Sequence, residues 1–383
     1  MSGTTAKLGA IASFWIAVGL IQTFNWGSGI PKAIVMLVVL IAAPCLLIAA
    51  RRVAPPAPGF TRGVTIAFWI ALALAIAYFG ARVIAPHIID IGTTTLAAGQ
   101  ALLHGQNPYA LPIDTGPESA GFTGYKYLPL MIVDYLPLGA AFGQRGVLIT
   151  NLVMLLASLW LMQRIAGTKL APLALLMLPL LAEQIFSKGA TDLAAALPLL
   201  GALALTQNTN SARSSFWCGV CVGLSIATKL LPGAAMLPAL IPATRRDLFA
   251  AGVIVGLLSV VPFIIAGPQD FWGNIVLFNL TRLPDSTSWL QAAPASVASA
   301  VHLVFAAAIL AAAVYVWRRA PPIITRAALA ATLGIAAILA GPGAHHNYQL
   351  WWLPFYALAL ALALAPAPRL GYISGEEIAS RDS

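Results

Sequence analysis

Long apolar runs separated by short polar segments repeat from one end of this 383-residue sequence to the other. A helix needs about 20 apolar residues to cross the hydrocarbon core of a bilayer, and the runs approach that length. The pattern therefore predicts an all-α polytopic membrane protein. The expected spans, about twelve in number, lie near 8–22, 32–50, 64–84, 146–163, 170–186, 192–205, 215–229, 231–243, 247–266, 297–317, 321–340 and 349–366.

The apolar run at 128–143 is ambiguous because it contains Pro129, Asp134 and Pro137, and proline inside a helix costs about 3 kcal/mol. The distribution of cations resolves the ambiguity, since cytoplasmic loops carry the excess of Lys and Arg. If this run does not cross and both termini are cytoplasmic, 14 of the 21 Lys and Arg residues lie inside. The other 7 lie outside: Lys32, Arg82, Lys126, Arg145, Lys188, Lys229 and Arg282. We therefore predict that 128–143 forms a helix in the outer interface.

Composition agrees with a membrane protein, because 60% of the residues are hydrophobic, 9% are charged and the mean hydropathy is +0.88. A soluble domain of this length could not bury so much apolar surface. The net charge of +9 does not indicate nucleic-acid binding, since the cations are divided among membrane loops. Cys45, Cys218 and Cys221 lie in apolar runs, so we expect helix packing rather than disulfides or redox chemistry.

The predicted topology places the unusual polar residues on the outer side of the membrane. A polar, aromatic- and Gly-rich segment at 86–127 follows the apolar run 64–84. Asp90 stands near its start, where the apolar helix should leave the membrane. Ionisable groups at membrane depth are costly and usually functional. The others on this side are Lys126, Asp134, Lys188, Asp192, Lys229, Arg282, Asp285, His345 and His346. The sequence therefore predicts a functional site at the outer face.

A series of motifs between about residues 64 and 364 resembles the GT-C glycosyltransferases that use polyprenol-phosphate sugars, specifically the mannosyl- and arabinosyltransferases of glycosyltransferase family 87. The motifs are Asp90, Gly105-Gln-Asn-Pro-Tyr109, Tyr125-Lys-Tyr-Leu-Pro-Leu130 with Pro137-Leu138, Thr228-Lys-Leu-Leu-Pro232 with Arg245-Arg246, and His345-His346 with Trp351-Trp352-Leu-Pro354. Two segments depart from the family pattern. Ser187–Asp192 replaces a Gly-Gln pair, and Asp285–Trp289 replaces an Asn-Gln-Ser element.

The resemblance implies a single GT-C-like membrane domain at 1–366, with an outer catalytic loop at 85–145, a large late outer loop at 267–296 and a cytoplasmic tail at 367–383. It implies inverting transfer of a sugar, mannose or another hexose or pentose, from a polyprenyl-phosphate donor. The acceptor would be a hydroxyl of a glycan or glycolipid. We expect the protein in a bacterial inner membrane, among membrane lipid, with its active site facing the periplasm.

The chemistry of such a transfer explains the residue types. A hydroxyl is a poor nucleophile and needs a carboxylate to accept its proton, the role that the resemblance gives to Asp90. The departing phosphate needs cations or hydrogen-bond donors. Candidates for binding the donor phosphate or sugar are Lys229, His345, His346, Lys126, Tyr127, Arg282 and Asp192. The sequence has no Asp-x-Asp or Glu-x-Asp pair, so we expect neither a metal nor another cofactor.

Each candidate also has a structural interpretation. Asp90 could cap a helix that begins near Thr93, and Lys229 could extend its ammonium group from a helix end to the headgroups. Lys126 could belong to an interfacial anchor belt, and Asp192 and Arg282 could pair with other charges. At the level of function, the alternative is a flippase or transporter of lipid-linked sugars. Transporters usually have pseudo-symmetric halves. Here the polar groups cluster on one side and the long interfacial loop has no counterpart in the second half, which favours the enzyme. A third alternative, a non-catalytic membrane scaffold, is disfavoured by the loop that contains Asp90.

Overall fold

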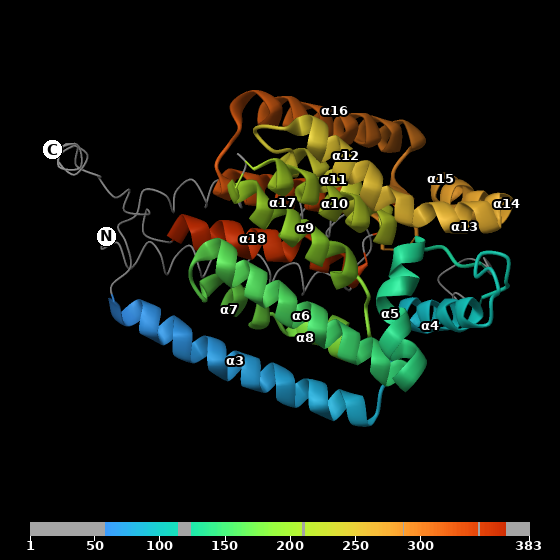
Figure 1. The fold of residues 1–383 in the computed structure, drawn as a ribbon, viewed down its shortest axis with the longest axis horizontal. Coiled ribbons are helices and arrows are strands. Elements are labelled where there is room, and N and C mark those ends of the chain that lie inside the picture. The colour runs from blue at the N-terminus through green and yellow to red at the C-terminus, as the bar shows by residue number, and fades with distance from the viewer. Residues whose placement is uncertain (1–57, 114–123, 209–210, 286, 344, 365–383) are drawn as a thin grey trace.

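The structure is a computed structural model that describes residues 58–113, 124–208, 211–285, 287–343 and 345–364, and its regular elements are all helical (Figure 1). The α-helices are α3 (Pro58–Ile84), α4 (Asp90–Leu103), α5 (Pro129–Phe142), α6 (Gln144–Ala166), α7 (Leu170–Leu176), α8 (Pro179–Ala182), α9 (Leu193–Leu205), α10 (Ala212–Thr228), α11 (Leu230–Leu240), α12 (Arg246–Leu257), α13 (Val261–Ala266), α14 (Pro268–Phe271), α15 (Phe278–Thr281), α16 (Ala295–Arg319), α17 (Ile323–Leu339) and α18 (Gln349–Leu364). Short 3₁₀ or π segments are η3 (Glu183–Ser187), η4 (Thr206–Asn208), η5 (Leu258–Val260), η6 (Trp272–Leu277), η7 (Trp289–Ala292) and η8 (His346–Tyr348). The predicted spans 8–22 and 32–50 and the tail 367–383 lie outside the described residues.

Four of the described helices are long and apolar enough to cross a bilayer by length and composition. They are Thr61–Ile84, Gln144–Ala166, Arg246–Ala266 and Ala295–Arg319, and they coincide with the predicted spans 64–84, 146–163, 247–266 and 297–317. Shorter apolar helices occupy the predicted spans 192–205, 231–243, 321–340 and 349–366. The prediction of one continuous span at 170–186 is wrong, because this segment is divided into α7, α8 and η3. The total of twelve spans stays a prediction.

The predicted helix at 128–143 is present as α5, which lies across one end of the bundle, whereas α3, α6, α16 and α18 run along it (Figure 1). Its position in the outer interface stays a prediction. Gly143 connects α5 to α6 with φ 57°, a left-handed conformation that glycine adopts at no steric cost. At Gly146 a side-chain carbon would lie 1.9 Å from the Leu138 carbonyl oxygen. The backbone conformation of Gly143 and the close approach at Gly146 let the chain turn sharply from the end of the bundle into a long helix.

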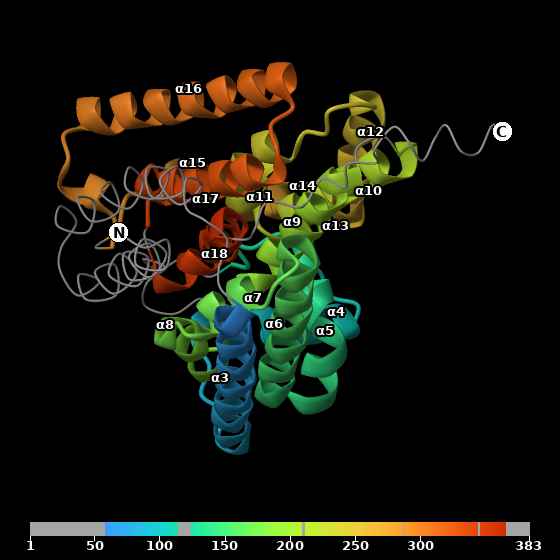
Figure 2. The ribbon, with the colours of Figure 1, turned by 90° about the vertical axis from the view of Figure 1, so that its left-hand side faces the viewer.

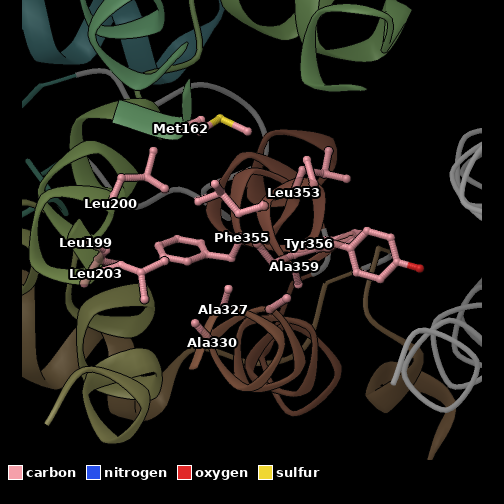
Figure 3. Close-up of a cluster of buried hydrophobic side chains, with 14 of the residues drawn as sticks. Met162, Leu199, Leu200, Leu203, Ala327, Ala330, Leu353, Phe355, Tyr356 and Ala359 are labelled. Atoms are coloured by element: carbon pink, nitrogen blue, oxygen red, sulfur yellow. The ribbon is translucent and has the colours of Figure 1, made fainter. Parts of the chain in front are cut away.

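The core of the bundle is α18, in which nearly every residue is buried. It packs against α6, α7, α9 and α17. Figure 3 shows Phe355 and Leu353 among side chains of neighbouring helices, including Met162, Leu199 and Ala327. In contrast, α16 buries only Ala312 and Val316 and lies along one margin of the bundle (Figures 1 and 2). Its other apolar side chains are placed to face lipid, as expected of a membrane protein.

Helices α10 and α12 pack backbone against backbone through two Gly-x-x-x-Gly sequences. Gly219 and Gly223 of α10 face Gly252 and Gly256 of α12, and a side-chain carbon at Gly223 would lie 2.4 Å from the Val253 carbonyl oxygen. Small residues four apart allow helices in a membrane to approach this closely. The contact fixes α10, whose last turn leads directly into Lys229.

We expect Gly223→Ala to destabilise the protein, because the added methyl group must force α10 and α12 apart. Overpacking of this kind costs about 1–3 kcal/mol. The midpoint of thermal unfolding in detergent measures the effect. Gly80→Ala is the matched control, since nothing lies within 4 Å of the added carbon and α3 gains helix propensity. Equal midpoints for the two variants would contradict the proposed backbone contact.

Candidate active site

Lys229 occupies a break between α10 and α11, where its backbone is extended with φ −152° and ψ 117°. Pro232 stands in the first turn of α11, a position at which proline is tolerated because no helical N–H bond is lost. This local geometry confirms the predicted break. It turns the side chain of Lys229 toward the N-terminus of α9, and only 12% of that side chain is exposed.

The carboxylate of Asp192 is completely buried at the start of α9. Its Oδ1 accepts hydrogen bonds from Lys229 Nζ and from Trp351 Nε1, both at 2.6 Å. Its Oδ2 accepts a hydrogen bond from Asn347 Nδ2, also at 2.6 Å. A buried carboxylate is tolerated only when it is paired and hydrogen-bonded, and these three donors meet that requirement.

Aromatic rings surround the Lys229 ammonium group on its other sides. Its Nζ lies 4.6 Å from the ring centroid of Tyr348, 5.0 Å from that of Trp351 and 5.8 Å from that of Tyr127. Tyr348 and Trp351 are stacked, with centroids 4.4 Å apart. A cation this close to aromatic faces is attracted by the ring quadrupoles. The rings therefore hold the cation in place without neutralising its charge.

A second cluster of charges is formed by Arg282, Asp285 and His345. Arg282 Nη2 lies 2.6 Å and His345 Nε2 3.1 Å from Asp285 Oδ2, and Thr287 donates its backbone N–H to Oδ1. Burial alone would raise the pKa of Asp285, but the hydrogen bonds from His345 and Thr287 hold it well below its usual range. Asp285 is therefore ionised at neutral pH.

Tyr348 joins the two clusters. Its ring lies over the Lys229 ammonium group on one side and meets the His345 ring edge to face at 5.2 Å. Its hydroxyl also contacts Arg282. The two charge clusters therefore form one continuous polar region, which consists of Asp192, Lys229, Arg282, Asp285 and His345 around the Tyr348 ring.

Asp90 is the first residue of α4, so the expected helix start near Thr93 is wrong by about one turn. The N-cap is Ile89, which has no capping side chain and donates its N–H to the Lys188 carbonyl oxygen at 2.9 Å. Within the part of the chain that the structure describes, the Asp90 carboxylate makes no hydrogen bond or ion pair. Unlike Asp192, it is therefore a carboxylate held in place only by its backbone.

Tyr127 is close both to Asp90 and to the first charge cluster, which is the Lys229–Asp192 pair. Burial is the largest cause that raises the pKa of Tyr127 well above its usual range, followed by the electrostatic effects of Asp90, Tyr348 and Asp192 in that order. The same ring faces Lys229, and Lys126 Nζ lies 5.7 Å from its centroid. Asp90 and Lys126 therefore border the polar region through Tyr127.

The Gly105–Tyr109 motif supports this arrangement rather than forming part of it. The Tyr109 hydroxyl donates a hydrogen bond to the Tyr127 carbonyl oxygen at 2.9 Å, and Asn274 Nδ2 donates to the Tyr109 carbonyl oxygen at 2.7 Å. Asn107 packs directly on the Cα of Gly267. The loop is thereby tied to α14 and η6 and holds Tyr127 in position.

Two other predicted features lie elsewhere or are only partly described. His346 opens η8, and its side chain lies outside what the structure describes. The Arg245-Arg246 pair lies at the opposite end of the bundle, where the Arg246 guanidinium stands 3.9 Å from the centroid of Trp317. Near it, buried Arg326 donates to the carbonyl oxygens of Ala239 and Ile241. These arginines therefore fasten helix ends far from the polar region.

Sequence reasoning did not identify Asn347, Tyr348 or the role of the Trp351 indole. A signal was available, because Asn347 and Trp351 are four residues apart and share one face of a helical segment. Their common partner could not be found in this way. Among the described residues, no group of three or more His, Cys, Asp or Glu side chains is arranged to hold a metal ion.

Comparisons with known proteins identify a family and a similar fold. The model of the family described as "Glycosyltransferase family 87" matches residues 126–342, more than half of the chain. ArnT from Cupriavidus metallidurans bound to undecaprenyl phosphate has a similar structure, with a TM-score of 0.56, 17% sequence identity and coverage of 82% of this chain and 62% of that chain. Its apo structure gives a TM-score of 0.52, 17% identity and coverage of 80% and 60%.

The likeness to ArnT confirms the predicted GT-C-like, all-helical membrane fold. At this identity it shows the fold alone, and the chain spans less than two thirds of ArnT. No curated protein matches the sequence.

We expect Trp351→Phe to destabilise the protein more than Trp352→Phe. Both indoles are buried, but only Trp351 donates to a buried carboxylate, whereas Trp352 Nε1 has no partner among the described residues. Loss of a hydrogen bond to a charged group costs about 1.5–3 kcal/mol. Thermal unfolding of the two variants in the same detergent measures the difference, and the neighbouring substitution controls for lost ring volume. Equal destabilisation would argue against the Trp351–Asp192 bond.

Proposed function

The chain belongs to glycosyltransferase family 87, and on that premise we propose that it transfers a sugar from a polyprenyl-phosphate donor to an acceptor hydroxyl. The acceptor is a glycan or glycolipid, and the sugar is mannose or another hexose or pentose. The observation that carries the proposal is that Asp90, Lys229 and the Arg282–Asp285–His345 cluster all lie around the Tyr127 and Tyr348 rings.

Asp90 acts as the general base. As the acceptor oxygen attacks the anomeric carbon, its proton passes to the Asp90 carboxylate. The bond between the anomeric carbon and the phosphate oxygen breaks, and polyprenyl phosphate leaves with the bonding electrons. Attack from the side opposite the leaving group inverts the anomeric configuration. The unpaired state of the Asp90 carboxylate among the described residues supports this role, because a carboxylate already held by a cation would be a weaker base.

The cations around Tyr348 receive the donor phosphate. The leaving group is already an anion, so it needs positive charge and N–H donors rather than a proton. Lys229 lies over the Tyr348 ring, Arg282 contacts the Tyr348 hydroxyl and His345 meets the ring edge to face. Lys126 borders the same region through Tyr127. His346 follows His345 in the chain and is a further candidate for binding the phosphate.

We place this end of the bundle at the periplasmic side of a bacterial inner membrane. The supporting observation is the charge at the opposite end, where Arg245, Arg246 and Arg326 gather in agreement with a cytoplasmic surface. A donor with an isoprenoid tail reaches such a site from the lipid. ArnT, whose fold is similar, has been observed with undecaprenyl phosphate bound.

The direct test is to incubate the purified protein with polyprenyl-phosphate mannose, arabinose and glucose, each with a lipid-linked glycan acceptor. We expect one donor to be consumed with formation of polyprenyl phosphate and a glycosylated acceptor. Thin-layer chromatography of a radiolabelled sugar follows both products. If the protein consumes none of the three donors but moves a lipid-linked sugar across the membrane of vesicles, the proposal of an enzyme is wrong and the protein is a transporter.

We expect Asp90→Asn to fold and bind donor normally but to lose activity by about 10²–10⁴-fold, the usual effect of removing a general base. Asparagine has the same shape but does not accept the proton. Stability should be preserved, because the Asp90 side chain makes no bond among the described residues. Asp247→Asn, at the exposed opposite end, is the control. Full transfer activity of the Asp90 variant would rule out this base.

A further inference from the structure

Asp192 is enclosed by the protein, and its partners leave it little capacity to bind a substrate. None of its surface is exposed, and donors from Lys229, Trp351 and Asn347 occupy three of the roughly four lone-pair positions of a carboxylate. We propose that Asp192 is a positioning residue that holds the Lys229 ammonium group for the donor phosphate and does not itself contact sugar or acceptor. This proposal rests on the proposed function.

The orientation of the ion pair supports a positioning role. Asp192 has an exposed side-chain fraction of 0%, whereas Lys229 keeps 12%, so the carboxylate lies behind the cation. An ammonium group has three N–H donors in total, and one points to Asp192. The Tyr127, Tyr348 and Trp351 rings, which line the polar region, lie 5.8, 4.6 and 5.0 Å from the same nitrogen.

The Asp192 carboxylate does not serve its own helix. Aspartate at an N-cap usually accepts a hydrogen bond from the first turn, but Asp192 occupies the N-cap of α9 with αR backbone angles and makes no capping bond. Its oxygens instead hold residues from the α10–α11 break, η8 and α18. A local stabilising role therefore does not explain this residue.

Pre-ordering of Lys229 has a physical advantage for binding. A lysine side chain loses much rotamer freedom when it is fixed, and ordering it on ligand arrival weakens affinity. Asp192, with the three rings, orders the ammonium group as the protein folds. The donor phosphate then meets a cation that is already in place.

A double-mutant cycle tests the proposal, with Asp192→Asn, Lys229→Met and their combination. The readouts are donor KM, kcat and thermal stability of each full-length variant. We expect each single variant to raise donor KM roughly 10- to 150-fold, the equivalent of one lost charge-assisted contact. Asp192→Asn should add nothing further in the Lys229→Met background, because its effect passes through Lys229. Additive effects would mean that Asp192 contacts substrate directly and would overturn the proposal.

A second variant separates positioning from a purely structural ion pair and remains informative if a single variant does not fold. Asp192→Leu/Lys229→Met replaces both charges by apolar groups, which is often neutral or stabilising for buried pairs. We expect this protein to fold with a stability lowered by the hydrogen bonds that Trp351 and Asn347 lose, and to keep the raised donor KM. Recovery of wild-type KM would reduce the pair to a structural role.

The failure of this proposal and the failure of the proposed function give different results. If the wild-type protein consumes no polyprenyl-phosphate sugar, the proposed function is wrong and the positioning role falls with it. If the wild-type protein is active but the effects in the double-mutant cycle are additive, only the positioning role is wrong.

Discussion

A single buried carboxylate organises the polar end of this membrane bundle. Asp192 has no access to solvent and lies among apolar helices, so it must be compensated wherever the chain folds. Its three donors come from the break between α10 and α11, from η8 and from the first turn of α18. Satisfying one charge therefore brings together parts of the chain that are distant in sequence. Lys229, Tyr348 and, through Tyr348, the Arg282–Asp285–His345 cluster all take their places relative to it.

The chemistry of this fold is confined to helix ends and breaks because the solvent is lipid. Within the hydrocarbon region every backbone polar group must be bonded inside its own helix, which leaves little room for irregular structure or charge. Asp90 stands at the first turn of α4, Lys229 in an extended break and Asp285 in a loop. The helices between them act as spacers. Close glycine packing of α10 on α12 makes one of these spacers rigid, so that Lys229 is presented from a fixed position.

The two ends of the bundle use similar residues for different purposes. At the polar end, cations face carboxylates and aromatic rings around a region where an anion could be received. At the other end, Arg246 and Arg326 donate to backbone carbonyl groups at helix ends and cover one tryptophan. The carbonyl groups at a helix C-terminus lack partners within the helix, and a guanidinium supplies several donors at once. Arg246 of the Arg245-Arg246 pair therefore stabilises the fold.

The sequence by itself determined the class of the fold, the gathering of polar residues at one end, the separate helix α5 and the break at Lys229. These follow from local signals: run length, the sidedness of Lys and Arg, and proline at a helix start. Only the tertiary structure decided that Lys229 pairs with Asp192, 37 residues away, and that Trp351, 159 residues away, shares that carboxylate. The structure also shows that the apolar run 170–186 is divided into α7, α8 and η3, and that α4 begins at Asp90 rather than near Thr93. Hydrophobic periodicity shows which residues avoid water, but the partner of a buried charge depends on how whole helices pack, and no local pattern encodes that.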